Sequence, residues 1–152
     1  MGNRQLGNMQ WAMAMGNGIF FEEEINSKNK KMATKYFKDT TVYKKAFAVA
    51  MQIFEVSKSF PKEERYSLTD QVRRSSRSVC ANMAEAYRKI QYPAHFVSKI
   101  SDCDMENSET AVWIDFAFAC SYIGLEEQQN LLDQNIKVGK LLHHMMANPE
   151  KY

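Results

Sequence analysis

SLTDQVRRSSRSVCANMAEAYRK, residues 67–89, has the pattern of an amphipathic helix. Apolar residues recur on one side of it at helical spacing. These residues are Leu68, Val72, Val79, Met83 and Ala86. Ser67 precedes the pattern and is expected to cap the helix, with Asp70 three residues later in a variant of the capping box. Because an apolar stripe of this kind must be buried, the segment predicts packing against further helices.

The opposite side of the same helix is basic. At 100° per residue, four arginines point about 100–200° away from Val72, and a lysine follows the last of them. The five basic residues are Arg73, Arg74, Arg77, Arg88 and Lys89. They are candidates for contacts with the phosphates of RNA or DNA.

Internal pairing is an alternative interpretation of these charges. Asp70 precedes Arg74 by four residues and Glu85 precedes Lys89 by four, which favours ion pairs within the helix. The segment 93–123 carries one lysine against five acidic residues. The basic face would then serve contacts with a neighbouring helix or subunit.

Three further segments have helical periodicity. Their expected ranges are residues 41–59, 93–123 and 126–147. Phe60-Pro61 ends the first, Pro93 begins the second, and Gly124 is expected to end the second as a C-cap. Four helices with short connectors predict an all-α fold, an antiparallel up-down-up-down four-helix bundle.

The segment 93–123 is apolar on two sides in its second half. One arc faces the expected core and includes Asn107 and Thr110, which are interpreted as a satisfied polar pair or a device that fixes helix register. The other side is predicted to be an oligomer interface with aromatic anchors. Its residues are Val112, Trp113, Phe116, Cys120 and Ile123. The alternative is a bundle asymmetric enough to bury both sides itself.

Two adjacent apolar rows run along the segment 126–147. One row includes Ile136, Gly139 and Leu142, and the other includes Leu131 and Val138. Both rows are expected to pack against neighbouring helices.

Residues 1–35 differ from the rest of the chain, since no helical or strand period persists there. They are expected to form a flexible N-terminal extension, which a start codon upstream of Met32 would explain. A basic arm that folds on a partner is the alternative. The bundle domain is then expected at residues 36–152.

Motifs for catalysis, metal binding or cofactor binding are lacking. Glu106 and Glu109 are not followed at i+3 by histidine, as a di-iron bundle would require, and glycine-rich phosphate loops are absent. The three cysteines lack CxxC spacing and are interpreted as core or near-core residues in a reducing compartment. We therefore expect a protein that is not an enzyme, with no cofactor, no metal and no small-molecule substrate.

The sequence also predicts a cytoplasmic location. No apolar run has the length needed to span a membrane, and the N-terminus has the features of a poor signal peptide. The formal net charge of +2 is too small to imply a partner by itself.

Five motifs occur in order along most of the chain. They are YKKAF at 43–47, FPKEERYSLTDQVRRSSRSVCANMAEAYRK at 60–89, YPAHFVSKISDCD at 92–104, ETAVWIDFAFACSYI at 109–123 and NPEKY at 148–152. In these motifs the chain, from about residue 40 to its last residue, resembles the family of 23S rRNA-intervening-sequence proteins, also described as S23-like. Met105 and Ser121 stand where this family commonly has glycine, so local packing is expected to differ there.

The resemblance implies a bacterial four-helix bundle with no enzymatic activity. Related accessory proteins of diversity-generating retroelements form pentameric rings, bind nucleic acid and associate with a reverse transcriptase. What the resemblance implies for this chain is therefore a ring-shaped homo-oligomer, such as a pentamer, that contacts RNA or DNA. A purely structural or protein-interaction module, whose charges serve oligomer contacts, is the alternative function.

Overall fold

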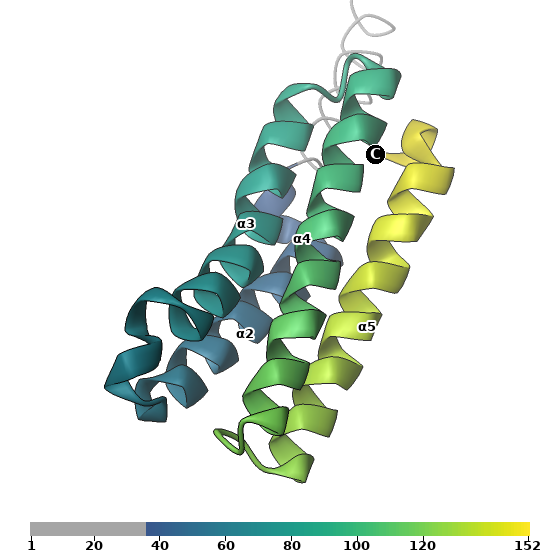
Figure 1. Cartoon of the computed structure of the whole chain (residues 1–152). Coiled ribbons are helices and arrows are strands. Elements are labelled where there is room, and N and C mark those ends of the chain that lie inside the picture. Colours follow the sequence, from purple (N-terminus) through teal and green to yellow (C-terminus); the bar gives the residue numbers. More distant parts are fainter. Residues whose placement is uncertain (1–35) are drawn as a thin grey trace, which may run out of the picture. The chain divides into compact units, whose positions relative to one another are not determined.

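The computed structural model describes residues 36–152, and the extension expected at residues 1–35 lies outside them. Four long helices form a bundle in which consecutive helices run in opposite directions (Figure 1). They are α2 (Thr41–Val56), α3 (Leu68–Arg88), α4 (Pro93–Ala119) and α5 (Leu125–Ala147). Short 3₁₀ helices flank them: η1 (Phe37–Asp39), η2 (Ser57–Ser59), η3 (Lys62–Tyr66) and η4 (Pro149–Lys151). The predicted all-α four-helix bundle is confirmed.

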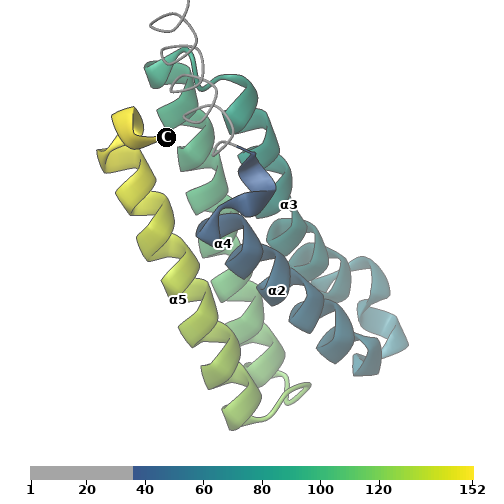
Figure 2. The same ribbon diagram turned by 180° about the vertical axis from the view of Figure 1, so that it is seen from behind.

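One apolar core runs along the bundle, and each of the four helices contributes to it. All five positions of the predicted stripe on α3 are buried. The core side chains of α4 include Phe96, Ile100 and Ile114, and those of α5 include Leu142 and Met145. Seen from behind, α2 crosses in front of α3 and α4 (Figure 2). The helical periodicity of the sequence therefore predicts correctly which side of α3 is buried.

Two pairs of buried polar side chains join neighbouring helices. The amide of Asn107 on α4 donates to the backbone oxygen of Asn135 on α5 (3.2 Å), and the amide of Asn135 donates to the backbone oxygen of Asn107 (2.9 Å). The Thr110 hydroxyl on α4 lies 2.9 Å from the Ser75 hydroxyl on α3. Asn107 and Thr110 thus have hydrogen-bond partners, as predicted: Asn107 on α5, and Thr110 on α3 and at the Glu106 carbonyl of its own helix (2.8 Å).

The start of α3 is capped by a residue outside it. Ser67 is the N-cap residue, as predicted, but its side chain accepts no hydrogen bond from the helix. The Glu64 carboxylate instead accepts bonds from the Ser67 hydroxyl and from the Leu68 N–H (3.2 Å), and its other oxygen accepts one from the Tyr122 hydroxyl (3.1 Å). These bonds, the Ser67 bond first, lower the pKa of Glu64. The expected capping role of Ser67 and Asp70 is therefore wrong.

The predicted end of α4 at Ile123 is also wrong. The helix ends at Ala119, and Ser121 adopts the left-handed conformation with φ 61°. The Tyr122 N–H then donates to the Ala117 carbonyl at 2.8 Å. This bond belongs to a common helix-ending motif whose left-handed position favours glycine. A serine in that position ends the helix earlier than the sequence indicates.

Gly124 begins α5 and does not end α4. It is the N-cap residue of α5, in an extended conformation (φ −81°, ψ 168°) that any residue adopts. The turn between the helices carries Ile123 back into the core, where it is buried. Its place in the core follows from the early end of α4.

Changing Ser121 to glycine is expected to raise the free energy of unfolding by about 1 kcal/mol. A left-handed conformation costs a residue with a side chain roughly 1–2 kcal/mol. Glycine avoids that cost but loses more conformational entropy on folding, which offsets part of the gain. Thermal unfolding followed by circular dichroism measures the change. Ser121→Ala is the control, since alanine keeps the backbone strain and should give no gain. A lower melting temperature for Ser121→Gly than for wild type would contradict the prediction.

Candidate nucleic-acid interface

Three cationic side chains lie against the ring of Phe54, near the end of α2. Lys58 Nζ lies 4.7 Å from the ring centroid, and the guanidinium carbons of Arg73 and Arg77 lie 5.0 and 5.6 Å from it. The electron-rich face of an aromatic ring attracts cations at such distances. We refer to Phe54, Lys58, Arg73 and Arg77 as the Phe54 cluster.

Arg73 is held in place by a hydrogen bond as well as by the ring. Its Nε donates to the Ser57 hydroxyl oxygen at 2.7 Å, and Ser57 is buried at the start of η2. Within residues 36–152, neither Nη atom of Arg73 has a hydrogen-bond partner. A guanidinium placed in this way presents donors that suit a phosphate oxygen.

The ion pairs expected inside α3 do not form. Glu85 pairs with Lys99 of α4 at 2.8 Å and leaves Lys89 unpaired within the described residues. Arg74 donates to the Gln71 side-chain oxygen (3.0 Å), and Asp70 makes no ion pair in that part of the chain. The expected i,i+4 pairing is therefore wrong, and Glu85 instead binds Lys99, which also binds Asp102 and Asn82.

The acidic residues of α4 likewise make no ion pair with Arg73 or Arg77 within the described residues. Asp104 lies 2.9 Å from the His143 ring nitrogen on α5, and the Glu109 carboxylate accepts a bond from the Trp113 indole N–H (2.9 Å). Burial and the nearby Glu109 charge raise the pKa of Glu106, while the Arg74 charge acts in the opposite direction. Within a single described chain, the acids of α4 therefore leave the charges of Arg73 and Arg77 unpaired.

Arg88 and Lys89 lie at the other end of α3. Fifteen residues separate Arg73 from Arg88, which corresponds to about 22 Å along a helix axis. Both residues at that end are exposed. The structure therefore brings Arg73 and Arg77 together, with Arg74 one residue away, and places the other two predicted residues apart.

Beside the Phe54 cluster is a basic hollow of about 650 Å³. The connector after α2 contributes Lys62, Arg65 and Tyr66 to its wall, and the cluster contributes Lys58 and Arg73. The helical periodicity of the sequence does not indicate this site, because the connector lies between two predicted helices. The only signal was the run KEER, whose mixed charges do not reveal where each side chain points.

The predicted apolar surface on α4 is present in part. Val112 and Phe116 are about half exposed, with 52% of Phe116 accessible, and Cys120 is exposed. Trp113 is only partly exposed and packs beside Phe116, with ring centroids 5.8 Å apart. Ile123 does not belong to this surface because it is buried in the core.

Met105 extends the exposed surface toward the start of α4. Seven and eleven residues separate it from Val112 and Phe116, which places each of them within about 20° of Met105 around the helix. All three side chains are exposed. We refer to Met105, Val112 and Phe116 as the α4 stripe.

The three cysteines lie in different surroundings. Burial raises the pKa of the Cys103 thiol to about 12 and that of Cys80 to about 11, so neither forms a reactive thiolate near neutral pH. Cys120 is exposed, and its expected place in or near the core is wrong. Residues 36–152 contain no group of three His, Cys, Asp or Glu side chains arranged to hold a metal ion.

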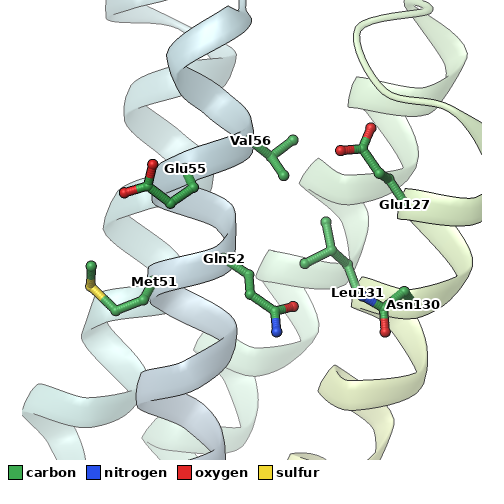
Figure 3. Close-up of a pocket in the computed structure, with 7 residues that line it drawn as sticks. All are labelled: Met51, Gln52, Glu55, Val56, Glu127, Asn130 and Leu131. Atoms are coloured by element: carbon green, nitrogen blue, oxygen red, sulfur yellow. The ribbon is translucent and has the colours of Figure 1, made fainter.

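A further hollow of about 350 Å³ lies between α2 and α5. Figure 3 shows Val56 and Leu131 pointing toward each other across it, while Met51 and Glu55 point away. A neighbouring hollow of about 390 Å³ between the same helices is lined in part by Lys44, Lys45 and Lys137. The periodicity of the sequence does not indicate that hollows lie between α2 and α5.

A family model described as 23S rRNA-intervening sequence protein matches residues 38–144. The chain belongs to this family. Among solved structures, the chain is similar to a protein of unknown function from the S23 ribosomal protein family of Bacteroides thetaiotaomicron. The two are 26% identical with a TM-score of 0.64, and the match covers 70% of this chain and 98% of the other. No curated protein matches the chain.

The Phe54 cluster and the α4 stripe both lie within the part of the chain that matches the 23S rRNA-intervening sequence family. Neither the family description nor that of the similar structure names an enzymatic activity. In this member of the family, the described helices α2 to α5 include none that is long and apolar enough to cross a membrane.

Proposed function

We propose that this protein is a non-enzymatic, self-associating bundle that binds nucleic acid through the Phe54 cluster and Arg74. The observation that carries the proposal is the position of Arg73 and Arg77, which lie against one ring with no carboxylate within ion-pair distance in residues 36–152. Charges held in place in this way bind phosphate with a smaller loss of side-chain freedom.

Electrostatics supports a polyanion as the ligand. Each phosphate contact releases a counterion from the nucleic acid, so several adjacent cations give affinity that depends steeply on salt. Arginine also binds phosphate through two parallel hydrogen bonds, which lysine cannot do. Kinship with the accessory proteins of diversity-generating retroelements, which the sequence resemblance implies, is consistent with such a role and stays a prediction.

The combined change Arg73→Ala, Arg74→Ala and Arg77→Ala is expected to weaken binding of RNA and DNA at least tenfold at low salt. The slope of log affinity against log salt should become shallower by roughly two to three units, since each lost phosphate contact contributes about 0.9. Fluorescence anisotropy with a labelled oligonucleotide across a salt series measures both quantities.

The matched control is the double change Arg88→Ala and Lys89→Ala, which removes charge at the other end of α3. It is expected to affect affinity less than the triple change. Unchanged affinity and unchanged salt slope in the triple variant would rule out phosphate contact at the Phe54 cluster.

The α4 stripe supports the self-association part of the proposal. Its three apolar side chains form one exposed row on a single chain, and such a row usually marks an interface. A second copy of the chain is the partner we propose, in a ring-shaped homo-oligomer such as a pentamer. In the alternative, a purely structural or interaction module, the same stripe would assemble the protein and the arginines would serve subunit contacts.

Changing Val112 and Phe116 together to serine is expected to convert the oligomer to a monomer, because it removes the apolar area that would drive association. Light scattering on the wild type should give a mass well above the 17.6 kDa of one chain. Ile136→Ser on α5 removes an equally exposed apolar side chain elsewhere and should leave the mass unchanged. A wild-type protein that is monomeric at micromolar concentration would contradict self-association.

A further inference from the structure

The basic hollow beside the Phe54 cluster combines positive charge with an open aromatic ring. Lys58, Lys62, Arg65 and Arg73 contribute to its wall, and no Asp or Glu lines it. Its volume of about 650 Å³ falls within the range of about 300–1,000 Å³ that is usual for pockets that hold small organic groups. The hollow is therefore large enough for more than a phosphate ion.

Two aromatic residues line this wall: Phe60, which is partly buried against the core, and Tyr66, which is 86% exposed. Within residues 36–152 the Tyr66 ring contacts no other aromatic ring, and its one charged neighbour at ring distance is the Arg65 guanidinium at 5.9 Å. A ring this open contributes little to the core. The ring face away from Arg65 is available to stack on a planar group.

Glu55, Glu63 and Glu64 are close to the hollow in the sequence, but none of them lines it. Glu64 accepts hydrogen bonds from Ser67, Leu68 and Tyr122. Glu55 pairs with Lys58 at 2.7 Å and offsets one of the four cations. The three remaining cations keep the hollow positive.

We infer that the basic hollow binds a single-stranded segment of nucleic acid, with one base stacked on Tyr66 and the adjoining phosphates against Lys62, Arg65 and Arg73. This inference rests on the proposed function and narrows it to unpaired strands. In a duplex the base faces are already stacked on one another, so a tyrosine ring finds no partner there. Basic grooves with aromatic platforms are how proteins hold single strands without reading sequence.

The test compares a short single-stranded RNA with a duplex of the same sequence, both measured by fluorescence anisotropy. Tyr66→Leu is expected to weaken single-strand binding about fivefold or more, because base stacking on an aromatic side chain is lost. Duplex binding should stay unchanged. Tyr66→Phe should bind the single strand like the wild type, since stacking does not require the hydroxyl.

Tyr92→Leu is the matched control, because Tyr92 is another exposed tyrosine and lies just beyond the other end of α3. It should change neither affinity. Equal single-strand affinities for Tyr66→Leu and wild type would overturn the inference, as would an equal loss with both ligands. With either of these two results, weaker binding by the Arg73, Arg74 and Arg77 triple variant would still support nucleic-acid binding at the Phe54 cluster. If the wild type binds neither ligand, both proposals fail.

Discussion

Truncation of Leu142 to alanine is expected to lower the free energy of unfolding by about 2–5 kcal/mol. Leu142 belongs to the core and is 0% exposed. The change removes apolar contacts and leaves a cavity that surrounding helices fill only in part. Since small domains are stable by about 5–15 kcal/mol in total, the loss is a large share of the stability. Urea unfolding followed by far-UV circular dichroism measures it.

Ile136→Ala is the control for this change. Ile136 belongs to the same apolar row of the sequence but is 53% exposed in the structure. The expected cost is therefore about 0.5 kcal/mol, as for most surface substitutions. Equal losses for the two variants would show that α5 is packed with a different side toward the core.

A valine in place of Gly139 is expected to cost about 1–3 kcal/mol, which is the usual penalty for overfilling a close contact. A Cβ atom built on Gly139 would lie 3.2 Å from the amide nitrogen of Asn107 and 3.8 Å from a carboxylate oxygen of Asp104. Further methyl groups have to displace the Asn107 amide, which holds α4 to α5 through its bond to Asn135. Chemical unfolding gives the change in stability.

At Gly124, the other glycine of the described residues, a side chain is expected to raise the stability. A Cβ atom on Gly124 meets nothing within 4 Å, and this residue is the N-cap of α5. Gly124→Ser should therefore stabilise the protein by a few tenths of a kcal/mol, because serine caps a helix better than glycine. If Gly139→Val were as well tolerated as Gly124→Ser, then α4 and α5 would not approach closely at Gly139.

The helices could be predicted because strong local signals delimit most of them. Pro93 begins α4 as expected, and α2 ends three residues before its predicted limit. The end of α4 was missed for a specific reason. A serine occupies the left-handed position at residue 121, where sequence reasoning expects glycine, so the later Gly124 was assigned the wrong role.

The candidate site was less predictable, because it depends on contacts between distant residues. Arg73 and Arg77 were recognised from their spacing on one helix. Their alignment against Phe54 requires the end of α2 to lie beside α3, and the pattern of one helix does not contain that information. Likewise, Lys99 competes for Glu85 only after α3 and α4 have packed.

The buried polar pairs also bear on how the bundle opens. Asn107–Asn135 holds α4 and α5 in axial register, since sliding one helix past the other would leave both buried amides without partners, and Ser75–Thr110 adds a bond between α3 and α4. Within the described residues, the one side-chain hydrogen bond from α2 to another long helix is the partly buried Gln52–Gln134 contact (2.8 Å), and hollows border α2 along α5. We therefore expect the lowest-energy partial unfolding to be detachment of α2, while the other three helices stay assembled.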